Sequence, residues 1–278
     1  MTPTTALAGE LRLRIGVRGT RSVAVEQFHT GALRVLRPHY LDRSGQVCYT
    51  AINPGGGYLG GDWYRFQLDV DAGASVLFTS QAATKVYRTP TEPARQHTEI
   101  RLGPDAVLES LPDQLIVYRE GSYEQTTRAE VDPTATYIAT EVVTPGWAPE
   151  GTRFGYRRAV LRTEIRRPTS PDPVLVDALV LDPAASGLTG LGGLDGRTHL
   201  GSLLVVDRRV DADLLDAVQD CCDAATGLLA GVTLGPGPAL VLRVLGDDTP
   251  SVAGLLFRVD ALLRRRWFNQ DHVDLRKC

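Results

Sequence analysis

The sequence predicts a mainly β protein that ends in two α-helices. Apolar and polar residues alternate from Leu11 to about Leu181, as expected of strands whose successive side chains point to opposite faces. After Asp207 the apolar residues change to helical spacing. The chain has 278 residues, 43% of them hydrophobic, which is enough to bury a sizeable core.

The strands are predicted in three groups. Residues 66–71 and 123–131 alternate as strands with one wet face, and the apolar runs 76–78 and 115–117 indicate strands covered on both faces. Two further strands are expected at 159–165 and 174–181. Turn signals at 71–73, 103–105 and 132–133 separate these strands. A strand every ten or so residues suits a sandwich, a barrel or a β-solenoid equally.

The C-terminal part is predicted to be helix–strand–helix over residues 211–268, after a β-rich part over 11–207, within one domain covering 1–278. Apolar residues from Leu214 to Leu229 predict a helix of about five turns, with Asp211 or Asp213 as its N-cap and Gly231 beyond its end. A strand follows at 239–245. Thr249 and the proline after it supply the cap and first turn of the second helix. Residues 187–201 are glycine-rich and are predicted to form a mobile surface loop.

Composition narrows the class of partner and the compartment. The formal net charge is -3, so the chain lacks the basic bias that attracts nucleic acid. Four cysteines, two of them adjacent at Cys221 and Cys222, fit a reducing cytoplasm better than a disulfide scaffold. No apolar stretch is long enough for a membrane span, and the first 19 residues do not have the pattern of a signal peptide.

A glycine-rich segment precedes the strand that begins at Trp63. Residues 55–60 formally match the dinucleotide fingerprint, but a strand follows where that motif needs a helix, so nucleotide binding is not expected. The glycines then indicate either a tight turn or a loop that presents the Asp62 carboxylate to a cleft or interface.

A second unusual segment, residues 79–88, places small polar residues directly after a buried strand. Thr79, Ser80 and Gln81 either form hydrogen bonds at strand edges or line a cavity with Lys85 and Arg88 at its mouth. The two interpretations have equal support from the residues alone.

Residues typical of catalysis or of a closed metal site are not spaced for either role. The histidines and cysteines do not show ligand spacing, and no serine lies in a G-x-S-x-G motif. Arg264, Arg265 and Arg266 close the last helix, where cations favour the helix dipole, and this basic end is expected to be solvated and open to a partner.

Two motifs in order identify a family. Residues 53–62 (Asn-Pro-x-Gly-Gly-x-x-Gly-Gly-Asp) and residues 81–88 (Gln-Ala-Ala-Thr-Lys-Val-Tyr-Arg) resemble the urease accessory protein UreD family, also called UreH. A third block at 108–112 is similar to the family's Leu-Glu-Trp-Leu-Pro, with Ser110 in place of tryptophan. Glu141 followed by residues 146–154 fits the next block, and the resemblance covers roughly residues 30–265.

This resemblance implies a β-helix or solenoid-like body with two C-terminal helices. It also implies a non-catalytic scaffold in the cytoplasm that joins UreF and the GTPase UreG on apo-urease and helps deliver nickel, with room for a homodimer within that complex. No tightly bound cofactor is expected, only nickel in transit, and neither nucleic acid nor membrane is an expected partner.

Site residues follow from combining the resemblance with the chemistry of nickel in transit. Such nickel needs exchangeable oxygen ligands, so Asp62 and Glu141 are expected to form a transient relay. The expected lining of the passage is Thr79, Ser80, Gln81 and Lys85, and the expected contacts to UreF are Arg264 and Arg265. Two alternatives stay open: a carbohydrate-active β-solenoid enzyme, and a structural subunit without metal transfer.

Overall fold

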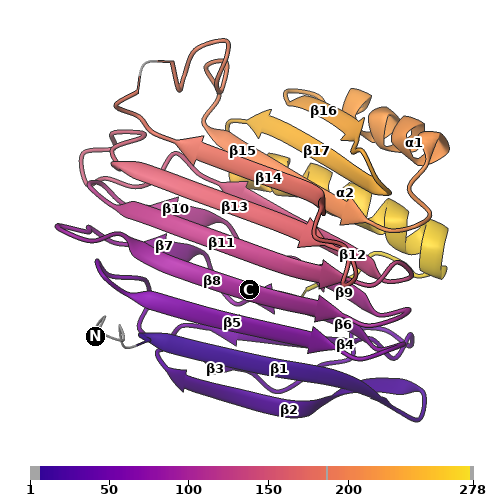
Figure 1. The fold of residues 1–278 in the computed structure, drawn as a ribbon. Helices are drawn as coiled ribbons and strands as arrows, with labels where there is room; N and C mark the ends of the chain where they lie inside the picture. Colours follow the sequence, from indigo (N-terminus) through magenta and orange to yellow (C-terminus); the bar gives the residue numbers. More distant parts are fainter. Residues whose placement is uncertain (1–6, 186, 276–278) are drawn as a thin grey trace.

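Two large β-sheets stacked face to face make up the body of the protein (Figure 1). The computed structural model describes residues 7–185 and 187–275, so the N-terminal segment expected to lack a signal peptide lies partly outside the described residues. The seven-stranded sheet contains, in spatial order, β14 (Pro173–Leu181), β13 (Arg158–Arg166), β11 (Ser122–Val131), β8 (Ala94–Leu102), β5 (Trp63–Val70), β1 (Gly9–Arg18) and β2 (Arg21–Gly31).

The second sheet has ten strands within the described part of the chain. Its main path is β16 (Leu229–Leu234), β17 (Ala239–Gly246), β15 (His199–Val206), β12 (Thr136–Val143), β9 (Val107–Ser110), β6 (Ser75–Ser80), β4 (Val47–Ile52) and β3 (Arg34–Val35). Two short strands, β7 (Thr84–Val86) and β10 (Leu115–Val117), pair with each other beside this path. The helices are α1 (Ala212–Asp223) and α2 (Thr249–Phe268).

The chain winds between the sheets as a β-solenoid, which confirms the predicted fold class. It passes from β4 to β5, β6, β8, β9, β11, β12 and β13, so successive strands alternate between the two sheets. The neighbours β5, β8, β11 and β13 are parallel, as are β4, β6, β9 and β12. A parallel pair needs a long crossover, and here a strand of the opposite sheet supplies it.

Side chains from successive turns stack in register inside the solenoid. Leu68, Ile100, Ala129 and Ile165 occupy equivalent positions on β5, β8, β11 and β13, and all are buried. Because strand side chains alternate, every second residue of a strand faces the opposite sheet and belongs to one such column. The main core of the protein therefore lies between the two sheets.

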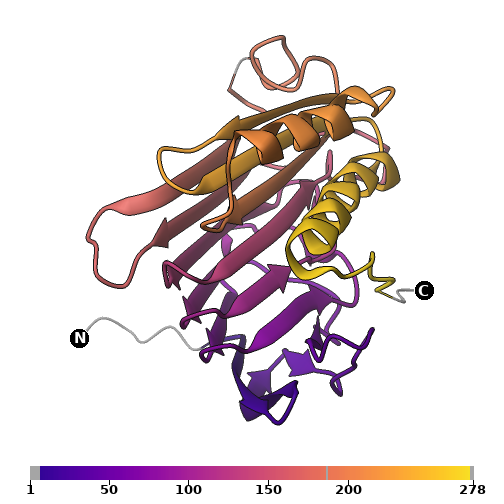
Figure 2. The same ribbon diagram turned by 90° about the vertical axis from the view of Figure 1, so that its right-hand side faces the viewer.

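A second core lies on the outer face of the ten-stranded sheet, where both helices pack (Figure 2). Val252, Leu255 and Val259 of α2 are fully buried against this sheet. The backbone N–H of Ser251 donates to Oδ1 of Asp248 at 2.8 Å, which makes Asp248 the N-cap of α2. The predicted cap, Thr249, is instead the first helical residue.

The predicted five-turn helix is too long. The α1 helix begins after its predicted N-cap, Asp211, but ends at Asp223. Gly227 takes a positive φ of 78°, and Leu229 then begins β16, which pairs antiparallel with β17. The apolar residues at 228 and 229 fit a helical period, but sheet pairing outweighs that local pattern. Residues 211–268 are therefore helix–strand–strand–helix.

The glycine-rich loop predicted at residues 187–201 is also shorter than expected. Strand β15 begins at His199, so the last three residues of the predicted loop belong to the sheet. Leu194 within the loop is buried. Among the described residues, no helix has the length and apolar character needed to cross a bilayer.

Candidate functional site

A cavity lined by both polar and apolar side chains lies inside the solenoid, between the two sheets. Its volume is about 140 Å³, enough for several water molecules. Its polar lining consists of Thr79, Ser80, Thr84, Gln96, Thr98, Ser110, Asp113, Gln125, Thr127, Thr140, Glu141, Thr163, Asp177 and Ser202. A polar wall inside a β core is unusual because buried polar groups need partners.

The register of the seven-stranded sheet explains why the cavity is polar. Beside the apolar column of Ile100 runs a column that contains Thr98, Thr127, Thr163 and Asp177, one residue from each of four neighbouring strands. The next inward position on β8 and β11 is a glutamine in both strands, Gln96 and Gln125. The inner faces of β8 and β11 thus change from apolar to polar side chains along the strand.

Glu141 supplies a carboxylate to the opposite wall. It lies on β12 beside Ser202 of β15, and both side chains line the cavity. The amide Nε2 of Gln125 donates to Oε1 of Glu141 at 2.9 Å. Burial raises the pKa of Glu141 to about 7, and the Gln125 hydrogen bond offsets part of that rise. The carboxyl group therefore changes charge near neutral pH.

A line of hydrogen bonds connects Glu141 to the glycine-rich end of the solenoid. The hydroxyl of Tyr58 donates to Oε1 of Gln96 at 2.8 Å, and the hydroxyl of Tyr123 donates to Oε1 of Gln125 at 2.9 Å. The Tyr123 hydroxyl also lies 3.3 Å from Oε1 of Gln96. Burial raises the pKa of both tyrosines, so the phenols stay protonated and act as donors.

An ion pair links the two sheets next to Glu141. The guanidinium of Arg243 on β17 contacts Asp177 of β14 and the hydroxyl of Ser202, and both of these residues line the cavity. The Arg243 side chain is about one third exposed. A positive charge that reaches solvent therefore lies at the Glu141 end of the cavity.

Asp62 does not line the cavity and serves a turn in this structure. Its Oδ2 accepts hydrogen bonds from the backbone N–H of Leu59 at 2.8 Å and from the hydroxyl of Tyr64 at 3.1 Å. Gly61 has a φ of 82°, which only glycine adopts without strain. The Tyr64 ring stacks on Tyr58 at 3.7 Å between centroids, so Asp62 lies at the far end of the same line of aromatic and amide side chains.

The polar segment after β6 both forms hydrogen bonds and borders hollow space. The hydroxyl of Thr79 donates to the carbonyl of Leu111 at 2.5 Å, and the hydroxyl oxygen of Ser80 accepts from the N–H of Asp113 at 2.9 Å. Both side chains line the cavity. Gln81 and Lys85 line a neighbouring hollow of about 210 Å³, which shares Ser80 with the cavity.

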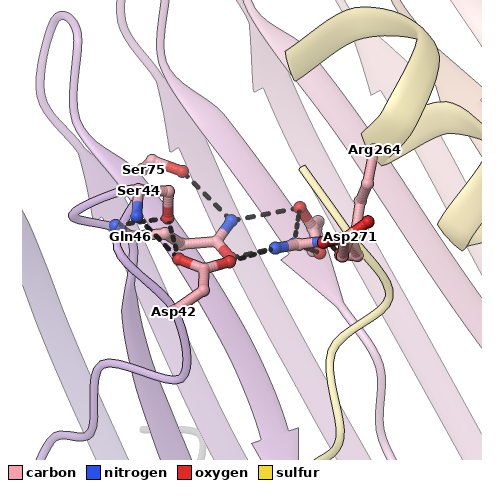
Figure 3. Close-up of polar contacts among 7 residues, drawn as sticks. Asp42, Ser44, Gln46, Ser75, Arg264 and Asp271 are labelled. Carbon is pink, nitrogen blue, oxygen red and sulfur yellow. Dashed lines mark hydrogen bonds and ion pairs between the residues drawn. The ribbon is translucent and has the colours of Figure 1, made fainter. Parts of the chain in front are cut away.

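The two predicted partner-binding arginines differ completely in exposure. Arg264 is fully buried, which corrects the expectation that it belongs to a solvated basic end (Figure 3). Its Nη1 lies 2.6 Å from both carboxylate oxygens of Glu109, and its Nη2 lies 2.9 Å from Oδ2 of Asp42. Nη1 also donates to Oε1 of Gln46 at 3.0 Å. Of the two arginines, Arg265 is the one exposed to solvent.

Sequence reasoning missed Gln125, Thr127, Asp177 and Ser202 as lining residues. A signal was present, because Gln125 and Thr127 lie in the same alternating series as the apolar Tyr123 and Ala129. Two polar residues on the apolar side of a strand indicate a polar hollow in the core. Asp177 and Ser202 carry no such local signal, because only sheet pairing brings them to Glu141.

The donors of the cavity are oxygen atoms spread along its walls. Within residues 7–185 and 187–275, no three His, Cys, Asp or Glu side chains are grouped closely enough to hold a metal ion. Hydroxyl, amide and carboxyl oxygens suit hard or borderline divalent cations and exchange them readily.

Together these features define a β-solenoid with a polar interior and two helices on one outer face. The model of the family described as "UreD urease accessory protein" matches residues 7–277. The chain belongs to this family.

Similar curated proteins span nearly the whole length of the chain. "Urease accessory protein UreD" of Actinomyces naeslundii is 52% identical over 269 residues, covering 97% of this chain and 98% of the relative. The protein of the same name from Arthrobacter sp. (strain FB24) is 49% identical and covers 97% and 94%. That of Bacillus cereus (strain ATCC 10987 / NRS 248) is 31% identical and covers 97% and 98%.

Proposed function

We propose that this chain is a non-catalytic scaffold required for nickel incorporation into apo-urease, and that it acts in the cytoplasm in a complex with UreF and UreG. Membership of the urease accessory family supports the link to urease. The single observation that carries the nickel role is the cavity between the sheets, with Glu141 and other oxygen donors in its wall.

Nickel would travel through this cavity as cargo. The hydroxyl and amide oxygens are weak, exchangeable ligands, which favour passage over storage. Glu141 adds a charge that can be switched by one proton, because its pKa is about 7. A cation that approaches the carboxyl group displaces this proton, and re-protonation helps to release the cation.

The relay proposed from the sequence also includes Asp62. Asp62 and Glu141 lie at opposite ends of the line of tyrosines and glutamines, and Thr79 and Ser80 line the space between the sheets. Gln81 and Lys85 would border the entry from the adjoining hollow. Glu141 has the stronger support, since its side chain faces the cavity directly.

Partner binding is proposed for the exposed end of α2. Arg265 is exposed there, whereas Arg264 holds the helix to the sheet. We expect Arg265→Glu to weaken retention of UreF in a pull-down, with Arg128→Glu, on the far sheet, as the matched control. Equal retention of UreF by both folded variants would remove Arg265 from the interface.

The central experiment is deletion of the gene in a urease-positive host. We expect urease to assemble but to contain little nickel and to have low activity. Fully metallated urease in the deletion strain would contradict the proposed function.

A single-residue test separates a nickel route from a purely structural subunit. Glu141→Gln keeps the shape and the hydrogen bond from Gln125 but removes the charge, so activation under limiting nickel should fall several-fold. Glu130→Gln changes an exposed glutamate of the outer sheet face and serves as control. If both variants bind UreF and activate urease at the wild-type rate, the structural-subunit alternative is favoured.

A further inference from the structure

A second hollow lies on the outer side of the ten-stranded sheet, between α2 and the tail that follows it. Its volume is about 220 Å³. The lining residues are Leu111, Asp113, Phe257, Asp260, His272, Val273, Asp274 and Leu275. Asp113 also lines the interior cavity, so the two hollows meet at the segment after β9. We call the outer hollow the tail pocket.

Asp260 brings to this pocket a carboxyl group with one oxygen that lacks a hydrogen-bond donor in the described part of the chain. The residue lies on α2 and is only 3% exposed. Among the described residues its Oδ1 finds no hydrogen-bond donor, although Asp260 is one of the residues lining the pocket. A buried carboxyl oxygen without a donor is destabilising, so its presence points to a ligand that donates to it.

The charges around Asp260 are unbalanced. Arg264 pairs with the carboxylates of Glu109 and Asp42, and Figure 3 shows its contact with Asp42. Asp260 feels the negative charge of Glu109 and the positive charge of Arg264, and burial raises the pKa of its carboxyl group. Three acids thus lie around one buried arginine, and one more cation would offset part of the excess negative charge.

The walls of the tail pocket select the kind of cation. Leu111, Phe257 and Val273 provide apolar surface, while Asp260 and Asp274 provide acids. Apolar walls with an acidic end match a lysine or arginine side chain, whose aliphatic stem packs while its charged head forms ion pairs. A bare metal ion would need several ligating side chains grouped together, and the described residues do not contain such a group.

We propose that the tail pocket is a docking socket for a basic side chain, an arginine or lysine, presented by a partner protein. Charge complementarity commits the site to this occupant. A basic occupant of the tail pocket is independent of nickel transfer. The pocket would give the protein a second, acidic contact region beside the basic end of α2.

The test uses the full-length protein and two small probes in NMR titrations that follow the His272 imidazole resonances. The first probe, n-butylguanidinium, copies an arginine side chain. The second, n-butylurea, has nearly the same shape without the charge. We expect the guanidinium probe to bind about tenfold more tightly than the urea probe, because a charged hydrogen bond to a buried acid has that value.

Variants of the acids show whether the pocket is responsible. Asp260→Asn should reduce the preference for the guanidinium probe to about twofold or less, and Asp274→Asn should reduce it several-fold. Asp274 is exposed, so its variant tests the proposal even if Asp260→Asn fails to fold. Asp271→Asn removes an equal charge from the same tail, at a residue whose side chain does not line the pocket, and should bind like the wild type.

Three results would overturn the proposal. The first is equal affinity of the wild-type protein for both probes. The second is a preference for guanidinium that persists in both Asp260→Asn and Asp274→Asn. The third is perturbation of this pocket by NiCl₂ but not by n-butylguanidinium, which would identify the occupant as a metal ion.

Discussion

Two glutamates on neighbouring strands of one sheet have opposite surroundings. Glu109 of β9 points outward to α2, is fully buried, and forms an ion pair with Arg264 at 2.6 Å. Glu141 of β12 points inward to the cavity, and its hydrogen bond comes from the neutral amide of Gln125. A glutamate on the outer face of the sheet therefore pairs with a full positive charge, whereas a glutamate on the inner face accepts from a neutral donor.

This difference separates a structural acid from one that is free to act. A buried charge paired with a guanidinium is fixed, because moving either partner leaves an uncompensated charge. A buried acid without such a pair keeps its proton to higher pH, so the pKa of Glu141 lies at about 7. Glu109 thus holds α2 to the sheet, while Glu141 can exchange a proton or a cation.

The largest effect is expected from removing the structural pair. Arg264→Met leaves Glu109 buried without its cation, which should lower the free energy of unfolding by about 3–5 kcal/mol. Urea unfolding followed by circular dichroism measures this change. Arg265→Met, one residue away and exposed, should change stability by no more than about 0.5 kcal/mol. Similar losses in the two variants would contradict the structural role of the Glu109–Arg264 pair.

A smaller effect on the free energy of unfolding is expected for Glu141→Gln, and this effect depends on pH. The folded protein holds the Glu141 proton more tightly than the unfolded chain, whose glutamate pKa is near 4.5. The charge therefore costs no stability below pH 4.5, costs progressively more as the pH rises to 7, and costs a constant amount above it. Glu141→Gln removes this cost, which is at most about 3 kcal/mol.

Unfolding free energies of the wild type and Glu141→Gln at pH 5, 6, 7 and 8 test this prediction. The advantage of the variant should grow between pH 5 and 7 and then level off. A difference that does not change with pH would show that Glu141 titrates as an ordinary exposed glutamate.

The pH dependence of urease activation extends the comparison to function. If the Glu141 carboxylate attracts nickel, activation under limiting nickel should rise between pH 6 and 8 as the group loses its proton. Glu141→Gln should lower activation several-fold at pH 8 and flatten this rise, while Glu130→Gln should follow the wild-type profile. A parallel rise in all three proteins would assign the pH dependence to another component.

The smallest effect is expected for Asp62→Asn. The carboxamide oxygen can still accept from the N–H of Leu59 or the hydroxyl of Tyr64, so the loss of stability should be about 1 kcal/mol or less. Activation should fall less than in Glu141→Gln, because Asp62 lies outside the cavity. Thermal unfolding and the activation assay measure the two quantities, and a larger loss of activation in Asp62→Asn would make Asp62, not Glu141, the more important relay residue.

Elements with local signals could be predicted from the amino-acid sequence. Alternation at residues 66–71 and 123–131 predicted β5 and β11, and the helical spacing of Leu255, Leu256 and Val259 predicted α2. These signals depend on the 2.0 and 3.6 periods of the backbone, which act between near neighbours. The order and spacing of the motifs at 53–62 and 81–88 were also sufficient to identify the family.

The positions of the charges, in contrast, depend on tertiary packing. Arg264 and Glu109 are 155 residues apart, and Asp177 reaches Glu141 through the pairing of β13 with β14 and the stacking of the two sheets. The length of α1 likewise depends on the addition of β16 to β17. Long-range packing fixes which carboxyl group meets a cation and which meets a cavity. Local periodicity does not decide this, because alternation shows which residues share a face of a strand but not what packs against that face.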